Sequence, residues 1–127
     1  MAVLSIHHVS LVVSDTRRSI AFYRDLLDLQ VNEKRPELGF PGAWFDVGAQ
    51  QIHLLQVDNP DPVTDRPSHG GHDRHFAMSV DNLDEIESRL RAMQRPYTRS
   101  RSGRAALFCR DPDGNGLELI QQPASGQ

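Results

Sequence analysis

The feature that most constrains the fold of this sequence is an internal repeat. Residues 8–15 (HVSLVVSD) line up with residues 75–82 (HFAMSVDN), and residues 52–56 (IHLLQ) line up with residues 117–121 (LELIQ). Self-similarity of this kind indicates two copies of one structural unit, because a duplicated segment constrains the whole architecture. We therefore expect the two halves of the chain to share one fold.

Each half has the pattern of a strand, a helix and three more strands. In the first half, apolar and β-branched residues at 6–13 predict a strand, and Ser14 and Asp15 offer side-chain oxygens to cap the following helix. Apolar side chains then recur at helical spacing over about three turns, which predicts an amphipathic helix ending near Asp28. Further strands are expected at residues 30–35, 43–48 and 50–57.

The second half repeats this order after an irregular stretch. Residues 58–73 hold three prolines, two glycines and five Asp or Asn residues, a composition that predicts a linker. The prediction is an α+β fold in which two tandem βαβββ modules form a curved mixed sheet around a metal site, as one domain over residues 1–127. The first module is expected at about 4–57, the linker at about 58–73 and the second module at about 74–122. In the second module the helix is expected at 83–93 and the strands at 75–80, 97–102, 105–110 and 116–122.

Each half also carries two possible metal ligands at matching positions. One lies near the start of the first strand and one in the last strand: His8 and His53, then His75 and Glu118. An ionised carboxylate between two leucines, as at Glu118, is costly to bury unless a positive group compensates it. We therefore expect these four side chains to converge on the concave face and to bind a divalent cation.

Strand alternation assigns faces to these residues. His53 is expected opposite Ile52 and Leu54, whose apolar side chains suit packing on the helix. The same rule predicts that His7 and His8 point to opposite faces, with His7 on the surface or toward the helix.

The donor set indicates the class of metal. Three imidazoles and one carboxylate suit Zn²⁺, Ni²⁺, Co²⁺, Mn²⁺ or Fe²⁺, and suit Ca²⁺ or Mg²⁺ poorly. A five- or six-coordinate ion would keep positions for water or substrate, which chemistry requires.

Four segments of the chain resemble the vicinal oxygen chelate superfamily, which contains glyoxalase I, extradiol dioxygenases, methylmalonyl-CoA epimerase, and fosfomycin and bleomycin resistance proteins. They are residues 8–15, 19–27 (SIAFYRDLL), 75–80 and 111–120 (DPDGNGLELI). The resemblance covers nearly the whole chain and implies paired βαβββ modules, a divalent metal and usually a homodimer.

The resemblance also bears on individual residues. It places His8, His75 and Glu118 at the superfamily's first-, fifth- and eighth-strand metal ligands, whereas glyoxalase I usually has Glu or Gln at the position of His53. Bacterial glyoxalase I has an Arg and an Asn that contact glutathione where this chain has Val12 and Val57. The resemblance therefore does not extend to glutathione recognition.

The resulting hypothesis is a metal-dependent lyase or isomerase of glyoxalase type that acts on a small oxygen-chelating substrate. Glu118 or His53 would move a proton between adjacent carbons, a role that needs a base poised near the working pH. Two alternatives stay open: an extradiol-type non-haem iron dioxygenase, and a non-catalytic small-molecule-binding protein of the resistance type.

Other conspicuous side chains receive less specific interpretations. Aromatic residues of the strands are expected in the core or at a dimer interface, and the loop histidines at the rim of the site or in solvent. Arginines beside the last hairpin are expected to be solvated, with an anion clamp as the alternative. These residues are Trp44, Phe45, Phe108, His69, His72, Arg99, Arg101 and Arg104.

Composition narrows the cellular context. A net charge of −3 and a pI near 6.0, with no block of like charges, argue against nucleic-acid binding. The single cysteine, Cys109, is expected to be a small buried residue and suits a reducing compartment, so the cytoplasm is the expected location. Residues 1–13 have neither a basic start nor an uninterrupted apolar run, and no membrane segment is predicted.

Overall fold

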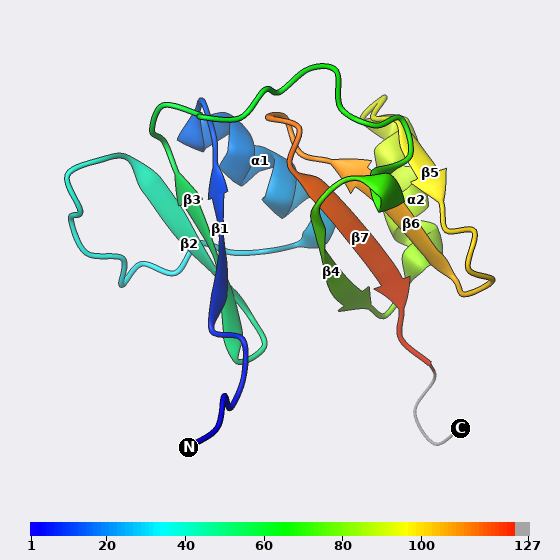
Figure 1. Cartoon of the computed structure of the whole chain (residues 1–127), viewed down its shortest axis with the longest axis horizontal. Coiled ribbons are helices and arrows are strands. Elements are labelled where there is room, and N and C mark those ends of the chain that lie inside the picture. Colours follow the sequence, from blue (N-terminus) through cyan, green and yellow to red (C-terminus); the bar gives the residue numbers. More distant parts are fainter. Residues whose placement is uncertain (124–127) are drawn as a thin grey trace. The chain divides into compact units, whose positions relative to one another are not determined.

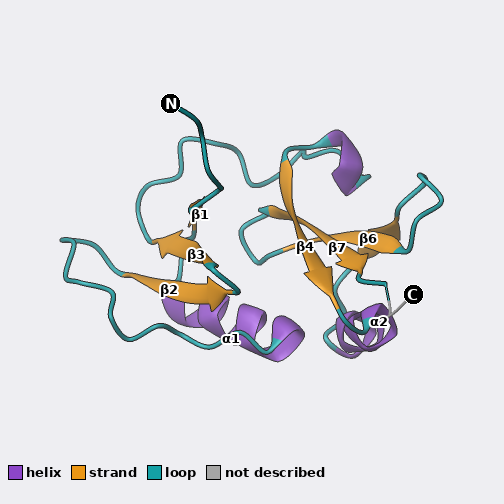
Figure 2. Ribbon diagram, turned by 90° about the horizontal axis from the view of Figure 1, so that it is seen from below, coloured by secondary structure: helices purple, strands orange, loops and turns teal. Residues whose placement is uncertain are grey.

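Both halves fold as a sheet with a helix on one face, as expected from the repeat (Figures 1 and 2). The computed structural model describes residues 1–123 and divides into two compact units, Met1–Pro60 and a second from Asp61 onward. The predicted α+β class with two βαβββ-type modules is confirmed. No helix within residues 1–123 has the length and apolar character needed to cross a membrane.

The first unit contains a three-stranded sheet in the order β1-β3-β2. Strand β3 lies in the centre, parallel to β1 and antiparallel to β2. The elements are β1 (His8–Val12), α1 (Thr16–Leu27), β2 (Gly42–Val47) and β3 (Gln50–Leu55).

The strand predicted at residues 30–35 is wrong. This segment makes only an isolated bridge, between Val31 and Phe45. The side chain of Asn32 accepts a hydrogen bond from the backbone N–H of Lys34, and this local turn competes with regular strand pairing.

The second unit contains a four-stranded sheet in the order β4-β7-β6-β5. Strand β5 is shorter than predicted, because the serine- and arginine-rich segment after Arg99 turns away and includes Gly103 at a φ of +88°. The elements are a 3₁₀ helix (Gly70–His72), β4 (His75–Val80), α2 (Leu83–Ala92), β5 (Tyr97–Arg99), β6 (Ala106–Arg110) and β7 (Gly116–Gln121).

The two helices begin with the same double cap. Asp15 accepts a hydrogen bond from the N–H of Arg18, and Asn82 accepts one from the N–H of Glu85, as side-chain caps do. In addition, the last-strand glutamine of each repeat, Gln56 or Gln121, accepts a bond from the first N–H of its helix. The repeated glutamine thus ties the helix to the sheet in both units.

Part of the irregular stretch between the repeats is anchored within the second unit. The carboxylate of Asp73 accepts two hydrogen bonds from Arg66 at 2.9 Å each and one from Arg110 at 2.7 Å. Arg66 also donates to the carbonyl of Pro62, and Arg110 to that of Pro67. The bonds from Arg66, followed by that from Arg110, lower the pKa of Asp73 far below its ordinary value.

Strand register is the same in the two units. His8 lies opposite Gln51, so that His53 is two residues further along β3. His75 lies opposite Gly116, so that Glu118 is two residues further along β7. Residues two apart share a face, and each unit therefore places its two predicted ligands on one face of adjacent strands.

Candidate functional site

In the first unit, the two predicted ligands stack face to face. The rings of His8 and His53 have centroids 3.9 Å apart and planes 17° apart. On its other side His53 stacks on Trp44, with centroids 4.4 Å and planes 9° apart. Ile52 and Leu54 point to the opposite face and are buried in the core, which confirms the predicted alternation around His53.

The prediction that His7 and His8 point to opposite faces is wrong. Their Nδ1 atoms lie 2.9 Å apart and the two rings meet edge to face. Strand β1 begins only at His8, so His7 lies outside the pleat and strand alternation does not govern it. His7 is exposed, as expected for a surface histidine.

A chain of hydrogen bonds holds the ring of His53. Its Nε2 lies 2.9 Å from Oε1 of Gln51, and Nε2 of Gln51 donates to Asp46 at 3.0 Å. The amide of Asn32 donates to both carboxylate oxygens of Asp46 at 3.1 Å. Partial burial, followed by the charge of His8, lowers the pKa of His53.

In the second unit, the two predicted ligands contact each other. Glu118 carries a carboxylate but is only 4% exposed, and it lies between two leucines on a strand. Its Oε1 is 3.3 Å from Nε2 of His75, and its Oε2 accepts a hydrogen bond from Arg104 at 3.0 Å. The guanidinium of Arg104 therefore supplies, within the same unit, positive charge of the kind that a buried carboxylate needs.

The other ring nitrogen of His75 determines what can lie between His75 and Glu118. Nδ1 of His75 lies 2.8 Å from the backbone carbonyl of Asp73, a contact in which Nδ1 must be the donor. A neutral ring would then point the lone pair of Nε2 at the carboxylate of Glu118. This contact is favourable only when a proton or a metal ion supplies positive charge, and Nδ1–H bonded to a carbonyl is the orientation typical of a metal-binding histidine.

An aromatic residue on the adjacent strand accompanies each pair. Phe108 pairs with Glu118 in the register of β6 and β7, as Trp44 pairs with His53 in that of β2 and β3. The ring of Phe108 meets that of His75 edge to face at 5.1 Å. Sequence reasoning assigned both aromatics to a core or an interface; aligning the penultimate strands of the repeat could have placed them beside the ligands.

The loop histidines lie near Phe108. His69 accepts a hydrogen bond from the N–H of Gly71 through Nδ1, and its ring centroid is 5.3 Å from that of Phe108. His72 is exposed, with its ring 5.2 Å from that of His69. His69 therefore packs beside an aromatic that itself contacts His75.

The arginines at the end of β5 and in the segment between β5 and β6 differ from one another. Arg99 donates to Glu87 of α2 at 2.6 Å, and Arg101 is exposed. Arg104 alone among these three contacts a predicted ligand, since it bonds to Glu118. No sequence pattern distinguished Arg104 from its neighbours.

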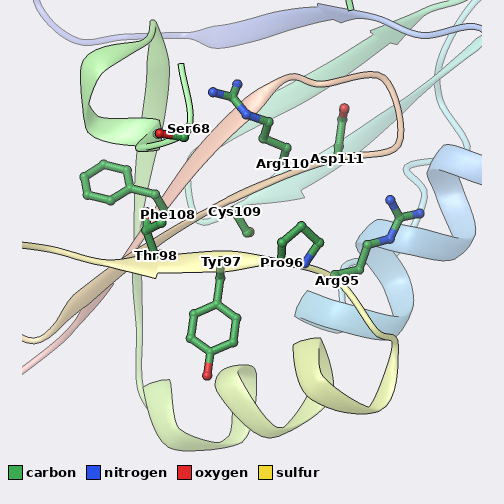
Figure 3. Close-up of a pocket in the computed structure, with 10 residues that line it drawn as sticks. Ser68, Arg95, Pro96, Tyr97, Thr98, Phe108, Cys109, Arg110 and Asp111 are labelled. Atoms are coloured by element: carbon green, nitrogen blue, oxygen red, sulfur yellow. The ribbon is translucent and has the colours of Figure 1, made fainter. Parts of the chain in front are cut away.

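A small cavity of about 150 Å³ in the second unit is lined by residues of β5 and β6, including Phe108 (Figure 3). Tyr97, which lines it, extends toward α2, and Arg110 is engaged with Asp73. Cys109 is 3% exposed, as expected, and burial raises the pKa of its thiol to about 12. The thiol is therefore protonated near neutral pH and is a poor nucleophile.

Each unit thus brings two of the four predicted ligands together. Within residues 1–123, no three His, Cys, Asp or Glu side chains form a group that could hold a metal ion. The donor atoms themselves, imidazole nitrogens and one carboxylate, fit a first-row divalent ion, and the His75–Glu118 contact calls for positive charge. Convergence of the four on one ion stays a prediction.

Comparison with known proteins identifies the family. A family model described as the Glyoxalase/Bleomycin resistance protein/Dioxygenase superfamily matches residues 5–119. The chain belongs to this superfamily. The resemblance inferred from the four sequence segments is therefore confirmed.

Relatives within the superfamily differ in their described roles. Lactoylglutathione lyase of Salmonella typhimurium is 29% identical, over 94% of this chain and 94% of that protein. The structure of a glyoxalase family protein of Bacillus anthracis shares the fold, with a TM-score of 0.78 and 23% identity over 97% of this chain and 98% of that one. A mutant of the fosfomycin resistance protein FosX of Listeria monocytogenes, complexed with Mn(II) and 1S,2S-dihydroxypropylphosphonic acid, has a TM-score of 0.76 and 16% identity over 96% of this chain and 95% of that one.

Proposed function

We propose that this protein is a divalent-metal-dependent enzyme of glyoxalase type that moves a proton between adjacent carbons of a small substrate with two neighbouring oxygens. The proposal rests chiefly on the His75–Glu118 contact, which requires positive charge between a ring nitrogen and a buried carboxylate. The similarity to lactoylglutathione lyase supports this reaction class, and the substrate itself is left open.

The proposed ligands are His8 and His53 from the first unit and His75 and Glu118 from the second. The two units could come from one chain or from two copies in the expected homodimer. When bound, the ion would act as a Lewis acid that stabilises negative charge on the substrate oxygens. The stack of His8, His53 and Trp44, of which His8 is exposed and the other two are partly buried, offers a flat surface beside which a small substrate can lie.

Of the two candidate bases, the contacts favour His53. Both carboxylate oxygens of Glu118 are engaged, one by His75 and one by Arg104. Withdrawing the carboxylate of Glu118 to accept a proton would break its bond from Arg104 and leave a buried polar group without that partner, which is costly. His53 donates through Nε2 to Gln51, so its Nδ1 would have to leave the ion before that lone pair could take a proton from one carbon and return it to the next.

The decisive experiment measures metal content and proton exchange together. Protein freed of metal would be titrated with Zn²⁺, Ni²⁺, Co²⁺, Mn²⁺ and Fe²⁺ and then incubated in D₂O with hemithioacetals and other α-hydroxycarbonyl compounds. We expect one equivalent of metal per set of four ligands, and metal-dependent deuterium incorporation at the carbon next to the carbonyl. Exchange should disappear in His53→Gln while metal binding remains, because an amide oxygen can ligate but cannot act as a base.

Three results would contradict the proposal. Oxygen uptake with Fe²⁺ and a catechol, without proton exchange, would favour a dioxygenase. Metal or small-molecule binding without turnover of any of these compounds would favour a binding protein. Full exchange activity in His53→Gln would assign the base elsewhere. The cytoplasmic location stays a prediction that does not affect these outcomes.

A further inference from the structure

We propose that Gln51 is a positioning residue that fixes the tautomer of His53, so that Nδ1 is the nitrogen His53 presents for ligation or proton transfer. The inference rests on the proposed function for the use made of Nδ1. The tautomer itself follows from contacts within the first unit and can be measured without metal or substrate.

The direction of the hydrogen-bond chain follows from the chemistry at its end. An ionised carboxylate only accepts hydrogen bonds, so Asp46 requires the amide nitrogen of Gln51 to face it. The bonds from Gln51, followed by those from Asn32, lower the pKa of Asp46, which keeps it ionised. The amide oxygen of Gln51 must then face His53, and Nε2 of His53 must be the donor.

Ring stacking completes the restraint. His8 on one face and Trp44 on the other hold the plane of the imidazole of His53. A stacked ring can still turn over about its bond to Cβ, which exchanges Nδ1 with the carbon Cδ2 and Nε2 with the carbon Cε1. The bond to Gln51 selects one of these two orientations, and the stack and the bond together determine where Nδ1 lies.

The second unit has no side chain equivalent to that of Gln51. Gln51 lies opposite His8 in the register of β1 and β3, and the equivalent residue opposite His75 is Gly116. A Cβ at Gly116 would lie 2.8 Å from the carbonyl oxygen of Arg74 and 3.1 Å from Cβ of His75, which leaves no room for a side chain. The second unit instead fixes the tautomer of His75 through the backbone carbonyl of Asp73.

The test is the tautomer of His53 in metal-free protein, read from the ring nitrogen chemical shifts at a pH where the ring is neutral. Wild type should show a single Nε2–H tautomer, and Gln51→Leu should show a mixture. The double variant Gln51→Glu/Asp46→Asn keeps an acceptor for Nε2 and the net charge, so the single tautomer should return. Gln50→Leu, next along the strand and exposed, is the matched control and should leave the shifts unchanged.

A measurement of metal affinity in the same variants separates this inference from the proposed function. Zn²⁺ affinity should fall about tenfold or more in Gln51→Leu, as is typical when the partner of a metal-binding histidine is lost, and should recover in the double variant. A mixed tautomer in wild type, or a single one in Gln51→Leu with native amide spectra, overturns the role of Gln51 even if wild type binds metal. If wild type has a single tautomer and Gln51→Leu has a mixture, the role of Gln51 is supported even when wild type binds no metal. In that case only the proposed function fails.

Discussion

The two units share one strand register but hold their predicted ligands by different interactions. In the first unit, His8 and His53 are held by ring stacking and by a hydrogen-bonded side-chain chain that ends at an exposed carboxylate. In the second, Glu118 is held by the guanidinium of Arg104, and His75 by a backbone carbonyl. The comparison indicates that the shared fold brings the same two positions together in both units. The interactions that hold the two side chains differ between the units.

This difference suggests that the two pairs have different roles, one in holding a cation and one in exchanging a proton or a ligand. A buried carboxylate that faces the lone pair of a histidine nitrogen is suited to holding a cation, because the contact is favourable only when positive charge lies between the two groups. A stacked imidazole with one nitrogen engaged and one lone pair available is suited to exchanging a proton or a ligand. Four variants test this contrast, in order of decreasing expected effect.

The largest effect is expected for Glu118→Gln. Removing the only carboxylate of the proposed donor set should weaken Zn²⁺ binding by more than about 100-fold, beyond what loss of a ligand's partner causes. Isothermal titration of metal-free protein measures this. The control is Glu85→Gln, which removes an exposed carboxylate paired with Arg89 on α2. Equal affinity in Glu118→Gln and wild type would show that the second unit does not supply the permanent ligand.

The next effect concerns stability. Asp73→Asn should lower the free energy of unfolding by about 1–3 kcal/mol at pH 7, because donors of Arg66 and Arg110 lose a charged acceptor. Since the pKa of Asp73 is lowered in the folded state, its contribution is complete above the unfolded value of about 4 and is lost as pH falls through the folded value. The difference between variant and wild type should therefore shrink in acid.

Urea titrations at several pH values measure this difference. Asp25→Asn, which removes one partner of an exposed ion pair with Arg24, is the control and should have no measurable effect. A difference between Asp73→Asn and wild type that grows as the pH is lowered would contradict the expected linkage.

A smaller effect is expected for Arg104→Met. This change removes the hydrogen bond to Oε2 of Glu118 and should weaken metal binding about tenfold, because the carboxylate loses a partner that orients it. Arg101→Met, an exposed arginine of the same loop, should leave affinity unchanged. Tighter binding in Arg104→Met would mean that Arg104 competes with the metal instead of positioning its ligand.

The smallest effect is expected for Trp44→Ala. An aromatic contact contributes about 0.5–1.5 kcal/mol beyond area burial, so loss of the stack should weaken metal binding about threefold. Trp44→Phe should retain the stack and most of the affinity. Trp44 is the only tryptophan, and its emission in wild type should change when Zn²⁺ is added. Unchanged emission at saturating Zn²⁺ would argue that His53 does not join the metal site.

Part of the candidate site could be predicted from the sequence. The repeat alignment identified both pairs, and strand alternation placed His53 on the face opposite the core. Both are consequences of local periodicity, which a sequence displays directly. The same alternation failed at His7, because β1 begins only at His8, and where a strand begins depends on its pairing with another strand.

What the sequence by itself determined is the duplicated βαβββ-type pattern, the helix cap at Asp15, and which residues of each half are equivalent. Only the tertiary structure decided that Gln51, Trp44 and Arg104 contact the proposed ligands. Periodicity fixes the face on which a side chain lies, whereas its neighbours depend on the register between strands and on the path of loops. Those are set by packing between segments far apart in the chain.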